Sequence, residues 1–309
     1  MRLHRLDLNR LVALDALLSE GSVSRAAERL NLSQPAVSAV LAQLRDHFDD
    51  ALLVSAGGAM RPTAFASELA KPVREMVLLA QAIARRRPSK ALAEIERRFN
   101  IVASDASAAF LLAPVVRKAI TEAPGLSFDL RPVTWQLTEQ LERGEVDLMI
   151  AAEEAASPHH PREVLYETPF ACLVSRDHAL SRGDLTLEAY RAGAHVAVAW
   201  TPGRVELMDA MAARIAGIER RIEVNLPSFS LLPEFLEGTN RIATLPKAYA
   251  DHLATRHALR SIPCPLPIPP LRGIVQWHRL QQEDIGFAWL LQALRERARE
   301  LGAQPASAA

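Results

Sequence analysis

The N-terminal segment constrains the fold of this chain most, because it holds three short helical patterns separated by sharp stops. Leucines recur at three- and four-residue steps over residues 8–18, and Gly21 ends that pattern. Ser22 stands where it can cap a second helix, and Ser33 where it can cap a third. Between them, residues 31–32 predict a tight turn. The segment therefore predicts three small helices around a common core.

The third predicted helix has a buried stripe and a small polar outer face. Its expected buried residues are Val37, Val40, Leu41 and Leu44, and its outer residues are Gln34, Ser38, Ala42 and Arg45. Pro35 fits the first turn, where backbone N–H groups lack a partner within the helix. In helix-turn-helix proteins, such a helix enters the major groove of DNA. Other small helical bundles share this spacing, so the spacing alone leaves both interpretations open.

A hairpin and a long helix are predicted next. Gly57-Gly58, flanked by short apolar segments, predicts a wing-like hairpin over residues 49–62. From the capping residue Thr63, a helix of about 36 Å is predicted over 63–87, kinked at Pro72 or tolerating it. Its apolar positions are Phe65, Leu69, Met76, Leu79 and Ile83. This stripe is too long for the small head to cover, which favours pairing with a second copy.

Beyond residue 91, short apolar runs alternate with helical patterns. The runs lie at 99–103, 112–120, 126–133, 137–141, 148–151 and 170–174. Alternation of this kind predicts parallel α/β sheets, which bind ligands beyond the C-terminal ends of their strands. The proline-rich stretch 262–270 cannot form a helix or a central strand. We expect it to carry the chain between two lobes, before a strand at 271–277.

Composition bounds the class of protein. At 309 residues the chain suits two or three domains. No stretch approaches the roughly 20 apolar residues of a membrane helix, and the first residues lack a signal-peptide core, so we expect a cytoplasmic protein.

Residues 1–90 hold 13 basic against 9 acidic side chains, which supports nucleic-acid binding only weakly. Cys172 and Cys264 are expected to be reduced and structural.

Scattered histidines are the main argument for an enzyme. They include His159, His160, His178, His252, His257 and His278. No HExxH, paired CxxC, GxSxG or glycine-rich phosphate loop accompanies them. We therefore expect no catalytic residues, no metal and no cofactor.

Residue identities sharpen these expectations. The head segments 8–14 (LNRLVAL), 24–38 (SRAAERLNLSQPAVS) and 61–63 (RPT) closely resemble the LysR-type transcriptional regulator family. The likeness continues at 99–105 (FNIVASD), 144–150 (GEVDLMI) and 176–180 (RDHAL). Three further segments are most similar to the branch with nodulation and aromatic-degradation regulators: 185–190 (LTLEAY), 243–246 (ATLP) and 277–278 (WH). The resemblance covers nearly the whole chain, and the head is its most specific part.

The resemblance implies a fold. It consists of an N-terminal all-α winged helix-turn-helix with a long linker helix, and a C-terminal α/β effector domain of two lobes, similar to periplasmic binding proteins. The expected domains are 1–62 for DNA binding, 63–90 for the linker and dimerisation helix, and 91–309 for effector binding. Within the last, lobe I is expected at 91–163 and 268–300, and lobe II at 164–267.

The resemblance also assigns DNA contacts. Gln34, Pro35 and Ser38 are expected to meet base edges, while Ser33 and Arg25 touch phosphate. The chemistry agrees, because glutamine can pair with adenine in the major groove and serine can serve several bases.

Three further positions are considered for contacts with DNA beside the recognition helix. Arg45 remains open between phosphate contact and solvated surface. Ser55 stands where relatives commonly carry an arginine in the wing, so a minor-groove or phosphate contact is lost. Arg61 is the candidate substitute, and weaker DNA affinity is one expected consequence.

The effector site is expected where the two lobes face each other. Ser104 and Asp105 follow the first strand, so a helix N-terminus near Ser107 would offer free N–H groups to an anion. The turn 227–230 is expected to face them across a cleft. The charge of Asp105 would repel a carboxylate unless an Arg or His lies nearby. The expected effector-binding residues are Ser104, Asp105, Trp135, Phe170, Trp200, Thr201, Ser228 and Phe229.

Aromatic residues among these positions indicate the ligand class. A cleft with a few polar anchors among aromatics suits an aromatic carboxylate or a flavonoid-like compound. Packing in the core is an equally weighted interpretation of each aromatic.

The expected partners are promoter DNA, a small-molecule effector and further copies of the chain, as a homodimer or homotetramer; RNA polymerase is a further candidate, and a membrane is not. Ligand binding is expected to shift lobe closure, alter the spacing of the heads and so change DNA bending. Two alternatives remain. One is a DNA-binding protein whose rear half only oligomerises without a ligand. The other is an exported solute-binding protein, which the head and the missing signal segment argue against.

Overall fold

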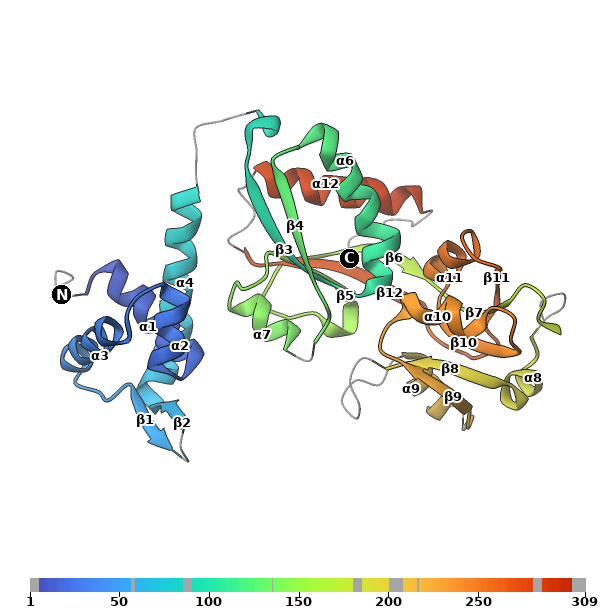
Figure 1. Ribbon diagram of the computed structural model, residues 1–309, viewed down its shortest axis with the longest axis horizontal. Helices are drawn as coiled ribbons and strands as arrows, with labels where there is room; N and C mark the ends of the chain where they lie inside the picture. Colours follow the sequence, from blue (N-terminus) through green and yellow to red (C-terminus); the bar gives the residue numbers. More distant parts are fainter. Residues whose placement is uncertain are drawn as a thin grey trace. The chain divides into compact units, whose positions relative to one another are not determined.

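The computed structural model describes residues 6–56, 59–85, 91–134, 136–179, 185–199, 208–215, 217–279 and 285–301. The chain divides into two compact units, Met1–Pro88 and Ser89–Ala309 (Figure 1). Each unit buries hydrophobic core residues of its own. Among the helices in these ranges, none is long and apolar enough to cross a membrane.

Three helices form the head as predicted: α1 (Leu8–Glu20), α2 (Val23–Leu30) and α3 (Gln34–Phe48). Gly21 ends α1 and Asn31 ends α2, both in the left-handed conformation with φ of 54° and 53°. Glycine and asparagine tolerate this geometry better than other residues, so the chain turns sharply at both positions. The shared core includes Leu14, Leu17, Val37, Leu41 and Leu44, with Val40 partly buried against it.

The predicted wing is a two-stranded hairpin. Strand β1 (Leu53–Ala56) pairs antiparallel with β2 (Ala59–Pro62). Asp50 anchors the hairpin, because its Oδ1 accepts the Leu52 N–H at 2.6 Å and the Thr63 hydroxyl at 2.7 Å. The wing is thereby held at both ends.

Helix α4 (Ala64–Arg85) is the predicted long helix. Thr63 caps it, since its Oγ1 accepts the Ala66 N–H at 3.0 Å, and the helix continues through Pro72. Ala66, Val73 and Val77 are buried, and α4 packs along α1. The apolar side chains of Phe65, Met76, Leu79 and Ile83 stay exposed, and Leu69 is half-buried. The head therefore covers a second apolar face of α4, adjacent to the stripe that the sequence predicted.

An ion pair joins α4 to α1. Arg74 and Asp15 are both buried, at 9% and 6% exposure, and Arg74 Nη1 lies 2.6 Å from Asp15 Oδ2. Arg29 from α2 approaches the same oxygen at 3.5 Å. A single carboxylate thus connects three helices of the head.

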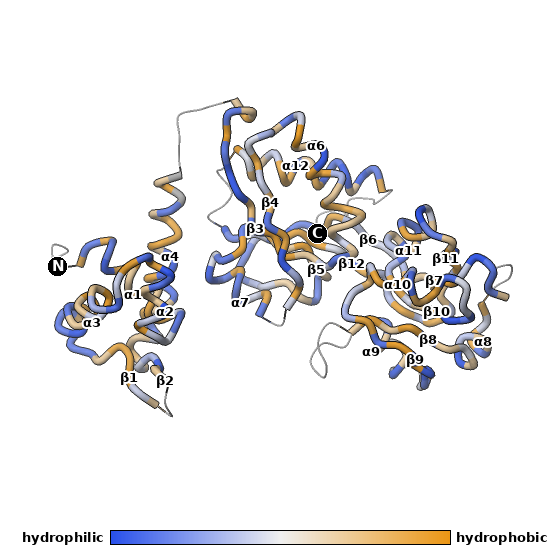
Figure 2. Tube along the Cα trace, viewed as in Figure 1, coloured by the Kyte–Doolittle hydropathy of each residue, from blue (hydrophilic) through white to orange (hydrophobic). Residues whose placement is uncertain are grey.

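Two five-stranded sheets form the second unit (Figure 1). The first has the order β4-β3-β5-β12-β6, with strands Leu126–Arg131, Arg97–Ala103, Leu148–Ala152, Leu271–Trp277 and Arg162–Thr168. The second has the order β11-β7-β10-β8-β9, with strands Leu259–Pro263, Phe170–Ser175, Arg241–Pro246, Ala194–Val198 and Arg221–Leu226. Figure 2 shows hydrophobic residues gathered along the strands of both sheets, where buried positions such as 148–150 and 242–245 lie.

Helices cover the sheets. Those of the first lobe are α5 (Asp105–Ser107), a π-helical turn (Ala108–Leu112), α6 (Ala113–Glu122), α7 (Leu137–Glu142) and α12 (Ile285–Glu300). Those of the second lobe are α8 (Leu187–Ala192), α9 (Met208–Ile215), α10 (Leu232–Leu236) and α11 (Lys247–Ala254). Helices α6 and α12 pack against each other beside the first sheet (Figure 1).

Each sheet is mixed rather than fully parallel. Strand β3 is parallel to β4 and β5, and β8 is parallel to β9 and β10. In contrast, β12 runs antiparallel to β5 and β6, and β7 runs antiparallel to β10 and β11. The strand that enters each sheet from the other lobe therefore runs against its neighbours, which local alternation of strands and helices does not reveal.

The crossings between lobes correct one expected boundary. The sequence boundary at 163/164 cuts through β6, whose residues up to Thr168 pair with β12 in the first sheet. The chain therefore enters the second lobe at Pro169. The return runs through the proline-rich segment, as expected, because β11 ends at Pro263 in the second sheet and β12 begins at Leu271 in the first. Strand β11 lies at the sheet edge, where a proline costs no ladder bond.

Candidate DNA-binding and effector-binding sites

The expected base-reading residues share the outer face at the start of α3. Ser33 caps the helix, with its Oγ accepting the Ala36 N–H at 3.4 Å. Gln34, Pro35 and Ser38 are exposed, while Val37 is buried on the opposite side. The cap and the buried stripe hold these side chains outward, so the first turns of α3 present an amide, a hydroxyl and a proline ring to solvent.

Two arginines of this surface make contacts that sequence reasoning missed. Arg25 is exposed, and its guanidinium donates to the Glu20 carbonyl oxygen. Arg45 Nε donates to the Ala51 carbonyl oxygen at 2.8 Å, and its Nη2 donates to that of Leu53 at 3.0 Å. Arg45 therefore fastens the end of α3 to the start of the wing. No sequence signal indicated this role, because Arg45 donates to backbone carbonyl groups, which every residue has whatever its side chain.

The wing places the two positions in question on opposite strands. Ser55 pairs with Met60, and Arg61 pairs with Val54. Both Ser55 and Arg61 are exposed. Arg61 therefore places a guanidinium on β2, in the residue pair next to that of Ser55, whose own side chain has no positive charge.

The two turns of the effector site meet in the structure. Ser104 caps α5: its Oγ accepts the Ser107 N–H at 3.1 Å, and its hydroxyl donates to Ser107 Oγ at 3.1 Å. Asp105 Oδ2 accepts the Ser230 N–H of the second lobe at 2.6 Å. Ser228 Oγ lies 3.2 Å from Ser230 Oγ. The Asp105–Ser230 hydrogen bond therefore bridges the lobes at the place where the sequence predicted a cleft.

A helix distortion lies directly behind this bridge. The helix that begins at Asp105 passes through the π-helical turn Ala108–Leu112 before it continues as α6. Such turns carry an extra residue and frequently occur at functional sites.

The aromatic residues expected at the site differ in placement. Phe229 is 7% exposed and belongs to the hydrophobic core, and Phe170 is half-buried at the start of β7. Trp135, Trp200 and Thr201 lie outside the described residues. The structure therefore supports core packing for Phe229.

Tyr249 on α11 is a neighbour of the site that sequence reasoning missed. Its ring centroid lies 6.3 Å from those of Phe229 and Phe110. Burial, with a smaller contribution from the Asp105 carboxylate, raises the pKa of Tyr249 to about 12. A buried tyrosine whose pKa is influenced by Asp105 thus lies close to the Asp105–Ser230 hydrogen bond. The nearest sequence signal was the family-like segment 243–246, which ends three residues before it.

The two cysteines are free and neighbouring. Cys172 lies opposite Ile262 across β7 and β11, so Cys264 two residues later is a diagonal neighbour on the same face. A hydrogen bond to the Cys264 thiol, and secondly burial, raises the pKa of Cys172, and the same hydrogen bond lowers the pKa of Cys264. Their separation in sequence concealed this contact.

A winged helix-turn-helix joined to a two-lobed α/β domain defines a DNA-binding regulator with an effector domain. The family described as "Bacterial regulatory helix-turn-helix protein, lysR family" matches residues 8–67, and "LysR substrate binding domain" matches residues 92–299. The chain therefore belongs to the LysR-type family of transcriptional regulators, whose members bind promoter DNA and small-molecule effectors, form oligomers, and are not enzymes.

Relatives span nearly the whole chain. Nodulation protein D 2 of Rhizobium tropici is 40% identical over 299 residues, covering 96% of this chain and 95% of that protein. Nodulation protein D 1 of Rhizobium meliloti (strain 1021) is 36% identical over 304 residues, covering 98% and 99%. A probable transcriptional regulator from Pseudomonas aeruginosa has a TM-score of 0.61 at 29% identity, covering 98% and 99%. Full-length OxyR from the same organism has a TM-score of 0.71 at 17% identity, covering 97% of each chain, which shows the fold alone.

Proposed function

We propose that this regulator reads its promoter with the first turns of α3. Gln34, Pro35 and Ser38 meet base edges, and Ser33 and Arg25 contact phosphate. The observation that carries this assignment is the outward placement of these side chains at a capped helix start, with Val37 buried behind them. A rigidly anchored helix with a polar outer face is what major-groove recognition requires.

Among the remaining arginines, Arg61 is the stronger candidate for a backbone contact. Arg45 already donates two hydrogen bonds to carbonyl groups, so a phosphate contact by Arg45 uses only its remaining donors. Arg61 is exposed on the wing. We assign the contact that Ser55 cannot make to Arg61.

Replacing Gln34 by alanine tests the recognition helix. We expect a loss of roughly 10- to 100-fold in affinity for the promoter, because a bidentate base contact contributes about 1–3 kcal/mol. Footprinting of the intergenic DNA beside the gene, with full-length protein at low and physiological salt, measures it. Gln43→Ala is the matched control, since Gln43 is also exposed on α3. Equal losses in both variants would contradict the assignment.

The second unit is proposed to sense an aromatic effector, such as an aromatic carboxylate or a flavonoid-like compound. The site is built around Ser104, Asp105 and Ser228. Its further candidate residues are Phe170, Phe229, Trp135, Trp200 and Thr201. The Asp105–Ser230 hydrogen bond supports this place, because a ligand between the two turns must replace or reinforce it. Ligand binding then shifts lobe closure, the spacing of two heads and DNA bending.

Self-association is proposed to use the exposed stripe of α4. Met76, Leu79 and Ile83 are 47%, 49% and 61% exposed, and their spacing of three and four residues is the a/d pattern of a coiled coil. We propose a homodimer through this stripe, and a homotetramer when the effector domains also pair. The single chain leaves these side chains in contact with solvent, and a second α4 would cover them.

A charged substitution tests this stripe. We expect Leu79→Asp to shift the protein to a smaller oligomer in sedimentation velocity, because an aspartate at a coiled-coil d position buries an unpaired charge. Gln81→Asp introduces the same residue at another exposed position of α4 and is expected to leave the oligomer unchanged. An unchanged sedimentation coefficient for Leu79→Asp would rule out this interface.

These assignments give each part of the chain a role. We propose that residues 1–62 bind DNA, 63–90 link and dimerise, and 91–309 bind the effector, in the cytoplasm. RNA polymerase at the regulated promoter is proposed as a further partner.

A further inference from the structure

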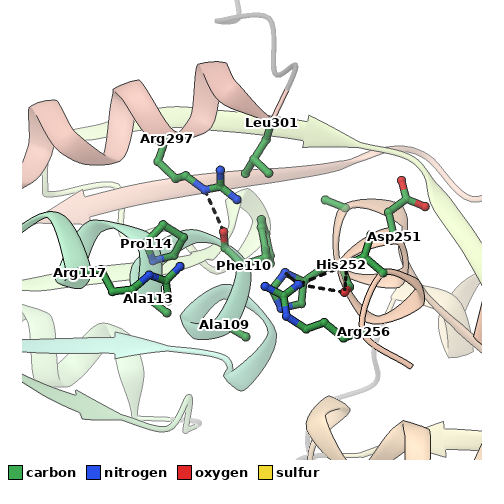
Figure 3. Close-up of a pocket in the computed structure, with 12 residues that line it drawn as sticks. Ala109, Phe110, Ala113, Pro114, Arg117, Asp251, His252, Arg256, Arg297 and Leu301 are labelled. Carbon is green, nitrogen blue, oxygen red and sulfur yellow. Dashed lines mark hydrogen bonds between the residues drawn. The ribbon is translucent and has the colours of Figure 1, made fainter. Parts of the chain in front are cut away.

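A cavity of about 600 Å³ lies between α6, α11 and the end of α12 (Figure 3). Small-molecule sites typically occupy roughly 300–1,000 Å³. The described lining includes Phe110 and Arg117 from the first lobe, Arg297 from α12, and His252 and Arg256 from the second lobe. None of these described residues belongs to the effector cleft around Asp105. The cavity is therefore a separate place where both lobes contribute to one lining.

Three arginines surround this cavity. Arg297 is oriented by its Nε, which donates to the Phe110 carbonyl oxygen at 3.1 Å. Arg256, in the turn after α11, places its Nη1 3.2 Å from His252 Nδ1 of that helix. Figure 3 shows Arg117 and Arg297 extending from one side toward the His252–Arg256 pair on the other. Guanidinium groups from two lobes thus approach a common space.

Acidic side chains do not balance this charge inside the cavity. Asp251 is the carboxylate among the described lining residues, and it pairs with Lys247, one turn earlier on α11. In Figure 3 its carboxylate points away from the arginines. Glu300 pairs with Arg297 Nη1 at 2.9 Å, at the outer end of α12. Arg117 and Arg256 remain without a carboxylate among the described lining residues, so the cavity has an excess of positive charge.

The imidazole of His252 responds to this charge. Burial lowers its pKa first, and Arg256, Arg297, Arg117 and His257 lower it further, because each cation disfavours a second one nearby. The positive charges of all three lining arginines therefore reach the imidazole of His252. A neutral imidazole beside them adds a hydrogen-bonding group without adding charge.

We propose that this cavity binds a small organic carboxylate. Guanidinium groups match a carboxylate with paired, charge-assisted hydrogen bonds. Three of them line this cavity, and two, Arg117 and Arg256, have no carboxylate among the described lining residues. Besides the polar Asp251, His252 and Thr255, the remaining lining is apolar and includes Phe110, Ala113, Pro114, Ala248 and Leu301. It fits the hydrocarbon part of such a ligand. Inorganic phosphate would leave this apolar part of the lining without a partner.

The bound carboxylate connects the two lobes. It contacts Arg117 and Arg297 in the first lobe and Arg256 in the second, so it binds only when these lobes are close together. A ligand that prefers one arrangement shifts the population toward it. Tyr249 separates the cavity from the cleft: its ring stacks on His252 with centroids 5.6 Å apart and meets Phe229 on the other side. Packed aromatic rings therefore lie between the cavity and the effector cleft.

Calorimetric titration of full-length protein with benzoate tests the site. Benzoate carries a carboxylate on an apolar ring, and benzamide is its neutral analogue of the same shape. We expect Arg256→Gln and Arg117→Gln each to weaken benzoate binding by about tenfold or more, because a hydrogen bond to a charged group is lost. Benzamide should bind to the wild type at least about tenfold more weakly than benzoate, for the same reason. Both arginines are exposed, so circular dichroism should show unchanged folding.

Matched controls distinguish benzoate binding in this cavity from benzoate binding elsewhere on the protein. Arg191→Gln removes the same charge from α8, away from the cavity lining, and should leave benzoate binding unchanged. Ser228→Ala alters the effector cleft and should leave in place the benzoate binding that Arg256→Gln removes. The proposal is overturned if Arg256→Gln binds benzoate like Arg191→Gln, if only Ser228→Ala abolishes binding, or if wild type shows no benzoate binding at millimolar concentration. Phosphate that binds as tightly as benzoate would mean simple ion binding and would equally overturn it.

Discussion

Replacing Asp15 by alanine is expected to lower the free energy of unfolding of the head by about 3–5 kcal/mol, the usual loss when one partner of a buried ion pair is removed. The substitution leaves the Arg74 guanidinium buried with its closest carboxylate gone, and it also removes the contact with Arg29. The expected effect is large because α1, α2 and α4 all meet at this carboxylate. Loss of the pair should therefore loosen the linker helix from the head.

Hydrogen exchange of the full-length protein measures this loss. Protected amides of α1 should exchange roughly 100- to 5,000-fold faster, since about 1.4 kcal/mol corresponds to tenfold. Asp46→Ala removes an exposed carboxylate from α3 and should change stability by less than about 0.5 kcal/mol. The double variant Asp15→Leu with Arg74→Leu should recover much of the loss, because no charge is then buried. Similar protection in Asp15→Ala and Asp46→Ala would refute the role of the pair.

Replacing Gly273 by alanine is expected to destabilise the effector domain by about 1–3 kcal/mol, or more if the core cannot adjust, as overpacking does. Gly273 lies directly opposite Tyr166 across β12 and β6, and the tyrosine ring covers it. An added Cβ would sit 2.2 Å from Tyr166 Cζ, so the ring must move. The ring has little room, because Phe110 packs edge-on against it with centroids 5.4 Å apart.

Thermal unfolding with a double-mutant cycle measures the Gly273 effect. Combining Gly273→Ala with Tyr166→Val should cost less than the sum of the two single losses, because valine leaves room for the new Cβ. Additive losses would mean that the clash with Tyr166 is not the cause. Burial raises the pKa of Tyr166, and a hydrogen bond with Ser107 partly offsets this. The displaced ring should therefore also disturb the start of the helix at the effector cleft.

Much of the fold was accessible from sequence because its signals are local. Gly21, Ser22, Asn31 and Ser33 act on backbone groups within a few residues, so their types alone placed the ends of α1, α2 and the start of α3. The alternation of strands and helices indicated α/β sheets for the same reason, and the family resemblance implied two lobes. The lobe boundary was misplaced at 163/164 because the last residues of β6 join the first sheet only by pairing with β12, more than a hundred positions later.

The candidate sites divide in the same way. Gln34 and Ser38 were placed on one face by helical spacing, and Pro35 was added by the family resemblance; all three are exposed. The role of Arg45 was missed, since its acceptors are backbone oxygens of the following loop. Tyr249 was missed because its partners Phe110 and Phe229 come from both lobes.

The sequence by itself determined the winged head, the long helix, the two-lobed α/β domain and the family, because helix caps, periodicity and short motifs depend on neighbouring residues. Only the tertiary structure decided that Asp15 meets Arg74, that Tyr166 covers Gly273, and that arginines at 117, 256 and 297 surround one cavity. These residues lie far apart along the chain, and only the packing of helices and sheets brings them together. Electrostatic and steric interactions act over a few ångströms in space, whatever the separation in sequence.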